Sequence, residues 1–197
     1  MQSSRNIILN RIRANKPQRA DAPLPNYIHF NSIFDDATAK FTEVLRSIGG
    51  EVVGVESMVF LKKDYQNRFK AFKNVVCRVE NLNLGVEEVG LVNDGHQFAD
   101  VQVAILRGQF GVAENGSIWV TDTEIGQHRV LPFITQHLVL VLEQNKIFKN
   151  LHEAYKDLTI DETGFGVFIA GPSKTADIEQ SLVIGAHGAR SLVVYLV

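Results

Sequence analysis

The chain contains 197 residues, 45% of which are hydrophobic, and its 20 Lys and Arg residues nearly balance its 22 Asp and Glu residues. A chain of this length buries roughly 70% of its unfolded surface and so needs no crosslinks. Its net charge of −2 lacks the basic excess typical of nucleic-acid-binding proteins. The single cysteine, Cys77, excludes an intramolecular disulfide, a cysteine-ligated iron–sulfur cluster and a zinc ribbon within this chain, and favours the reducing cytoplasm.

Residues 1–29 are predicted to form a helix and a proline-containing linker, and residues 30–197 a single domain. Isoleucines recur at helical spacing between residues 7 and 12, which indicates a short amphipathic helix. The segment lacks the continuous apolar stretch and cleavage site of a secretory signal. No apolar run in the chain reaches the roughly 18 residues of a membrane helix, so we expect no transmembrane segment.

Helices and strands alternate through the first half of the domain. A helix is predicted for Asp35–Ile48, where apolar residues recur every three or four positions and Gly49-Gly50 follows. The next elements predicted are a strand at Glu51–Val55, a helix at Tyr65–Phe72 and a strand at Asn74–Val79, where Cys77 is expected to be a buried thiol. This alternation indicates an α/β fold with a largely parallel sheet.

The second half continues the same pattern. The predicted strands are Val89–Val92, Ser117–Thr121, His137–Leu142, Val167–Ala170 and Leu192–Val197, and the predicted helices are Phe148–Leu158 and Thr175–Ile184, the last ended by Gly185. The strand from His137 is continuously apolar after its first residue, which is typical of a strand covered on both faces.

The loop after the strand at Val167–Ala170 is the first candidate binding site. Gly171 permits close approach of the backbone to a ligand, and Ser173, Lys174 and Thr175 add hydrogen-bond donors and a positive charge. Thr175 is also a suitable N-cap residue for the predicted helix, so the same segment fits a structural loop with no ligand. It is neither a Walker P-loop nor a nucleophile elbow, because the required glycines are missing.

The turn at residues 111–117 is the second candidate. Glu114 precedes an Asn-Gly pair between apolar strands, which would hold its carboxylate at a sheet edge, either near a cleft or in solvent. None of the six histidines shows metal-ligand spacing, so no metal site is predicted. His137, His187 and Arg129 lie in predicted loops or at strand edges, where they are either structural residues or members of one converging site.

The segment 168–179 (FIAGPSKTADIE), followed by 182–188 (LVIGAHG) and the last strand, resembles the most distinctive block of the LUD-domain family of bacterial lactate utilization proteins. The segment 111–116 (GVAENG), Arg129, Leu131-Pro132 and His137 are similar to its middle block. The resemblance covers about residues 35–197, with departures at Ala189, where proline is common, and at Asn115, where threonine is commoner.

The resemblance implies a three-layer α/β fold of the NagB/RpiA/CoA-transferase-like type with a mainly parallel sheet. It also implies a non-redox subunit in the oxidation of L-lactate to pyruvate, which would act with iron–sulfur and cysteine-rich partner proteins. Iron–sulfur clusters are expected only in those partners, and no cofactor in this chain. Residues 113–116 (AENG) further resemble a CoA-transferase motif whose Glu attacks an acyl thioester, although Ala113 replaces its serine.

Three functional hypotheses follow. The first is a subunit of a lactate-oxidising assembly that binds a small anionic metabolite through Gly171, Ser173, Lys174 and Thr175, with Arg129 and His187 as further ligand-binding residues. The second is a stand-alone acyl or sugar-phosphate enzyme that uses Glu114 as nucleophile or base, with His137 as a second catalytic candidate. The third is a ligand-binding regulatory module without chemistry.

Overall fold

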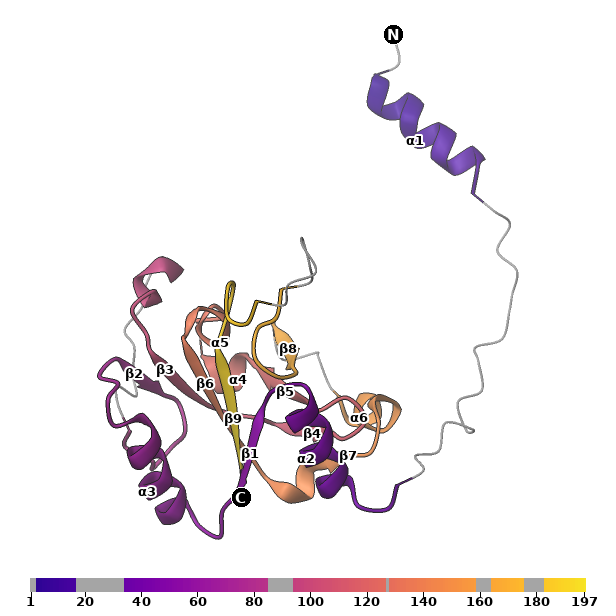
Figure 1. Ribbon diagram of the computed structural model, residues 1–197. Helices are drawn as coiled ribbons and strands as arrows, with labels where there is room; N and C mark the ends of the chain where they lie inside the picture. Colours follow the sequence, from indigo (N-terminus) through magenta and orange to yellow (C-terminus); the bar gives the residue numbers. More distant parts are fainter. Residues whose placement is uncertain (1–2, 17–33, 85–93, 127, 159–163, 176–182) are drawn as a thin grey trace. The chain divides into compact units, whose positions relative to one another are not determined.

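A computed structural model describes residues 3–16, 34–84, 94–126, 128–158, 164–175 and 183–197 (Figure 1). The chain divides into two compact units, Met1–Asn31 and Ser32–Val197. The first contains the predicted N-terminal helix, α1 (Ser4–Ala14), which Ser3 caps by accepting a hydrogen bond from the backbone N–H of Asn6. No residue of α1 is buried. The predicted linker prolines lie outside the described residues.

Helix α2 (Ala37–Ser47) opens the second unit and confirms the prediction for this segment. The side chain of Asp36 caps its start by accepting from the backbone N–H of Ala39 at 2.9 Å. The Gly49-Gly50 pair ends it as expected, because Gly49 adopts a φ of +91° and the N–H of Gly50 donates to the carbonyl of Leu45. Phe41 and Leu45 are fully buried, so α2 is fixed against the core.

Within the described residues, the main sheet has five strands, all parallel. Their spatial order is β1 (Glu51–Gly54), β9 (Ser191–Leu196), β6 (His137–Leu142), β3 (Val103–Arg107) and β2 (Val75–Cys77). The α/β class with a mainly parallel sheet is therefore confirmed. The predicted strand at Val89–Val92 lies outside the described residues, and β3 was missed by the sequence prediction.

Successive side chains of the central strands point to opposite faces of this sheet and enter two separate cores. On one face, Val139 and Val141 of β6 pack with Leu61, Tyr65 and Phe69 of helix α3 (Met58–Phe69). Helix α3 begins seven residues before the predicted start at Tyr65, because Ser57 caps it and residues 61, 65 and 69 recur every four positions. Cys77 is fully buried in this core, as predicted.

The other face of the main sheet packs against α2 and a second sheet, which has four strands in the part of the chain that the structure describes. The second sheet has the order β7 (Ile147–Phe148), β4 (Phe110–Val112), β5 (Ser117–Thr121) and β8 (Gly166–Ile169). Its pairs are antiparallel except for β4 with β7. Helix α6 (Leu151–Asp157) covers its outer side, where Ala154 packs with Phe110 and Trp119 (Figure 1).

Short helical segments join these strands. They are η2 (Gly95–Phe98), α4 (Asp122–Ile125), α5 (Leu131–Ile134) and η3 (Gln144–Lys146). The short helix α5 brings Pro132 and Phe133 to the amino end of β6. None of the described helices is long and apolar enough to cross a bilayer.

The helix predicted from Thr175 to Ile184 is wrong at both of its described ends. Lys174 and Ile184 form an antiparallel bridge, and the backbone N–H of Thr175 donates to the carbonyl of Val183 at 3.1 Å. The hydroxyl of Thr175 donates to the same carbonyl and accepts from the N–H of Val183. Because the two ends pair with each other, Gly185 does not end a helix here; residues 176–182 lie outside the described residues.

Candidate functional site

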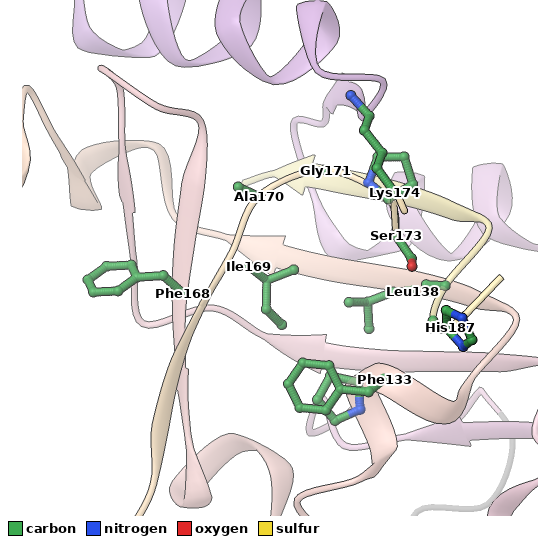
Figure 2. Close-up of a pocket in the computed structure, with 13 residues that line it drawn as sticks. Phe133, Leu138, Phe168, Ile169, Ala170, Gly171, Ser173, Lys174 and His187 are labelled. Carbon is green, nitrogen blue, oxygen red and sulfur yellow. The ribbon is translucent and has the colours of Figure 1, made fainter. Parts of the chain in front are cut away.

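The loop after β8 borders a pocket of about 280 Å³ (Figure 2). The predicted residues Gly171, Ser173, Lys174 and His187 all line it. The remaining lining residues are Pro132, Phe133, Leu138, Phe168, Ile169, Ala170, Pro172, Gly188 and Ala189. The structure thus brings together four residues that were singled out from two separate sequence segments. We call this cavity the loop pocket.

The end of α2 holds the backbone of this loop in place. Gly171 has a φ of +74°, and a Cβ at this position would lie 2.9 Å from the carbonyl oxygen of Ile48. The ring of Pro172, which is buried, lies 3.4 Å from the Cβ position of Gly49. The glycine turn after α2 and the Gly171-Pro172 pair therefore form one packed corner, which fixes the start of the candidate site.

Ser173 is positioned by the 185–188 loop. Its N–H donates to the carbonyl of Ala189, and its own carbonyl accepts from the N–H of Gly185, both at 2.9 Å. A Cβ at Gly188 would lie 3.2 Å from the Oγ of Ser173, so only glycine permits this approach without displacement. Figure 2 shows the Ser173 hydroxyl on the side of the pocket where Leu138 and His187 lie.

Lys174 and His187 are both exposed at the rim of the loop pocket. The side chain of Lys174 extends away from His187 in Figure 2, and its Cε lies 3.8 Å from the Cβ position of Gly49. Its flexible four-carbon stem lets the ammonium group sample a wide region around the rim. Thr175, by contrast, does not line the pocket, and its hydroxyl is bonded to the backbone of Val183.

Glu114 lies in the predicted hairpin turn between β4 and β5, and its carboxylate binds the first residue of helix α6. Oε1 accepts a hydrogen bond from the backbone N–H of Leu151, the first residue of α6, at 2.8 Å. The turn and the Gly171 loop are neighbours, since Cβ positions at Gly116 and Gly171 would both contact Ile48. Glu114 is not among the residues that line the loop pocket.

Arg129 makes a bidentate ion pair with Asp122, at 3.0 and 2.9 Å, and lies over the ring of Phe165. It does not line the loop pocket. The guanidinium is therefore already matched by a carboxylate and an aromatic face, which is a geometry that arginine favours.

His137 begins β6 at the amino end of the parallel sheet and does not line the loop pocket. Its Nδ1 lies 2.8 Å from the Oγ of Ser191, and its ring packs on Phe72 at a centroid distance of 4.7 Å. Burial, and secondarily the charge of Arg190, lower the pKa of His137. The neutral imidazole is therefore the favoured form near pH 7.

Sequence reasoning missed the apolar wall of the pocket. Phe133, 43% exposed, lines it from the end of α5, and Leu138 does so from β6. In the sequence, the Leu131-Pro132 pair beside Phe133 stands out only as part of the block that resembles the LUD-domain family. The exposure of Phe133 and the burial of Pro132 are visible only in the structure, so no sequence pattern identified this wall. Among the described residues, no group of three or more His, Cys, Asp and Glu could hold a metal ion.

The sequence of this chain is similar to those of known proteins. The family model described as "LUD domain" matches residues 60–197. An uncharacterized protein of Neisseria meningitidis serogroup B is 31% identical over 100 residues, which are 49% of this chain and 42% of that protein. Lactate utilization protein C of Bacillus pumilus is also 31% identical over 100 residues, 48% of this chain and 41% of that protein. The matched segment thus covers less than half of these curated relatives.

Among solved structures, a DUF162 family protein from Deinococcus radiodurans superposes with a TM-score of 0.62 at 13% identity. The alignment covers 81% of this chain and 95% of that one, and it supports the fold alone. The LUD-domain model, by comparison, matches the sequence from before β2 to the end of the chain. It includes the loop after β8 and the 185–188 loop, which both line the loop pocket. The chain belongs to the LUD-domain family.

Proposed function

We propose that this chain binds a small anionic metabolite in the loop pocket and acts in the cytoplasm as a non-redox subunit of an L-lactate utilisation system. The observation that supports ligand binding is the convergence of Gly171, Ser173, Lys174 and His187 on one cavity. The role in lactate use is supported by family membership and by the name of the relatives in Bacillus pumilus, Shouchella clausii and Exiguobacterium.

The pocket suits a small anion in both size and chemistry. Its volume of about 280 Å³ lies just below the range for drug-sized ligands, roughly 300–1,000 Å³, which suits a smaller molecule. The Ser173 hydroxyl and the His187 ring can donate hydrogen bonds, and Lys174 supplies a positive charge. The apolar wall of Phe133, Leu138 and Ile169 suits a short carbon chain.

Titration calorimetry with L-lactate and pyruvate tests the ligand-binding part of the proposal. The full chain is expected to bind at least one of them saturably, and Ser173→Ala or Lys174→Gln to weaken binding about tenfold, because each removes a hydrogen-bond or charge partner. Lys63→Gln, on α3 at the other face of the sheet, removes the same charge as Lys174→Gln and should leave binding unchanged. Equal affinities in all of these variants would refute binding at this pocket.

The proposed partners are an iron–sulfur protein and a cysteine-rich protein, which would carry the electrons. Affinity purification of the tagged chain from cells grown on L-lactate is expected to recover a protein with the absorbance of an iron–sulfur cluster. Deletion of the gene is expected to impair growth on L-lactate and not on glucose. Normal growth on L-lactate in the deletion strain would refute the assigned role.

The other two hypotheses remain predictions. A stand-alone enzyme that uses Glu114 would turn over an acyl or sugar-phosphate substrate without partner proteins, and Glu114→Gln would abolish that turnover. A regulatory module would bind the anion yet show no turnover in any reconstituted mixture. The engagement of the Glu114 carboxylate with the start of α6 favours neither over the proposed role.

A further inference from the structure

A second cavity, of about 300 Å³, adjoins the loop pocket. The two cavities share Phe133, His187 and Gly188. The second one adds the α5–β6 connection, including Gln136, and the residue before β9, Arg190. We call it the Arg190 pocket. Because three residues line both cavities, a ligand in one lies directly beside the other.

Arg190 gives the second cavity its own positive charge. Its side chain is exposed, and it forms no ion pair with any residue in the described part of the chain. Its backbone N–H donates to the carbonyl of Gln136 at 2.8 Å, which fixes the start of the side chain at the pocket wall. The charge of Arg190 also acts on His137, whose pKa it helps to lower.

The two glycines of the 185–188 loop each lie against one of the candidate binding residues. A Cβ at Gly188 would lie 3.0 Å from the Cβ of Ser173 in the loop pocket. A Cβ at Gly185 would lie only 2.4 Å from the Cγ of Arg190, and Gly185 has a φ of +76° that other residues rarely adopt. The same short loop therefore packs against Ser173 at one end and Arg190 at the other, with His187 between them.

Lactate and pyruvate each have six non-hydrogen atoms and leave much of the two joined cavities empty. Each cavity alone is near the lower limit for small-molecule sites, whereas the pair falls well within the usual range. Phe133 provides an exposed aromatic face common to both, which suits an uncharged segment between two charged ends.

We propose that the two cavities are halves of one elongated site, and that Arg190 binds a second negative group of the ligand. This inference rests on the proposed function and narrows its ligand to an organic dianion. One negative group lies at Ser173 and Lys174, the apolar middle crosses Phe133, and the other negative group lies at Arg190.

Titration calorimetry of the full chain with two matched series tests this inference. The first series contains succinate, glutarate and adipate, and the second contains butyrate, valerate and hexanoate, which have the same chain lengths and a single charge. At least one dicarboxylate is expected to bind about tenfold more tightly than its monocarboxylate, which corresponds to one charge-assisted contact. Arg190→Gln is expected to remove this advantage, and Lys63→Gln to retain it. Ser173→Ala is expected to weaken both series alike.

The outcomes separate the two proposals. If the dicarboxylate advantage is absent, or persists in Arg190→Gln, the second anion site is refuted. The loop-pocket proposal then still stands, provided that Ser173→Ala weakens the monocarboxylates. If neither series binds and L-lactate and pyruvate also fail, both proposals are refuted together.

Discussion

At the scale of single residues, the sequence identifies candidate site residues by their chemical type. Their contacts in the fold determine whether each side chain is available to bind a ligand. Ser173 and His187 face a cavity, whereas Arg129 is matched by Asp122 and Glu114 by the backbone of Leu151. A guanidinium or carboxylate that is already paired gives up that interaction before it can bind a ligand. Leu151 is 37 positions from Glu114, and Asp122 is seven positions from Arg129 with the short helix α4 and a loop between them, so neither pair follows a helix or strand repeat that a sequence pattern could reveal.

His137 is expected to make stability depend on pH. Burial, together with Arg190, depresses its pKa in the folded state, so the unfolded chain takes up a proton first as the pH falls. The contribution of His137 is therefore intact above the unfolded pKa, about 6.5, and is lost as the pH falls through the lower folded pKa. Urea denaturation measured between about pH 7.5 and pH 5 should show a falling free energy of unfolding.

His137→Gln provides the control for this prediction. The amide cannot be protonated in this range but can still reach Ser191, so the variant should lose less stability than the natural chain between the same two pH values. An identical pH dependence in the two proteins would show that His137 is not the group responsible.

At the scale of elements, the Glu114 carboxylate is expected to stabilise helix α6. It accepts from the N–H of Leu151, next to the N-cap Asn150, where negative charge also complements the helix dipole. Glu114→Ala should lower the free energy of unfolding by about 1 kcal/mol, a typical cap value, and Glu114→Gln by less because it retains an oxygen acceptor. Chemical denaturation measures both, and equal stability of all three proteins would exclude the cap.

Gly171 tests the packed corner between α2 and the loop pocket. Alanine there must adopt a left-handed conformation and place its Cβ 2.9 Å from the Ile48 oxygen. We expect Gly171→Ala to cost about 1–2 kcal/mol or more of stability. Gly54→Ala is the matched control, because no heavy atom lies within 4 Å of its Cβ position. If both substitutions cost the same in thermal and chemical denaturation, the corner does not constrain the loop.

Elements with a repeating pattern were predictable and those without one were not. Helix α2 has an apolar repeat, a cap and a glycine stop that all agree, so its ends were found within about two residues. Strands β4 and β7 contain only three and two residues, which is too short for any periodicity. The segment from Thr175 to Ile184 has the sequence pattern of a capped helix. In the structure its two ends pair with each other instead, Lys174 with Ile184 and Thr175 with Val183.

At the scale of the whole molecule, the parallel sheet was predictable and its partner sheet was not. Alternating helices and strands imply crossovers and therefore a parallel sheet. The strand that leads into the loop pocket, β8, does not belong to the parallel sheet. It is an antiparallel edge strand of the second sheet. The pocket consequently lies at the end of β8 and the amino end of β6, and not at the carboxyl edge of the parallel sheet, where ligands of open α/β sheets usually bind.

A partly buried hydrogen bond connects the last strand of the fold to helix α3. The hydroxyl of Tyr195, a fully buried residue of β9, donates to Asp64 of α3 at 2.8 Å, across 131 positions of sequence. Asp64 in turn is paired with Arg68, so the acceptor is held in place. Tyr195→Phe removes the donor from a charged acceptor and should lower the free energy of unfolding by about 1–3 kcal/mol.

Tyr65 is the matched control, because it belongs to the same core and its buried hydroxyl has no hydrogen-bond partner among the described residues. Burial, and secondarily Cys77, raise the pKa of Tyr65 to about 12. Burial, and secondarily the hydrogen bond to Asp64, also raise the pKa of Tyr195, so both tyrosines are neutral at pH 7. Tyr65→Phe removes a buried hydroxyl that forms no hydrogen bond with the described residues. It should leave the free energy of unfolding unchanged or raise it. Chemical denaturation of both variants at pH 7 measures the difference. A loss in Tyr65→Phe as large as in Tyr195→Phe would show that the hydrogen bond to Asp64 adds no stability beyond that of a buried hydroxyl without a partner, and would refute this link.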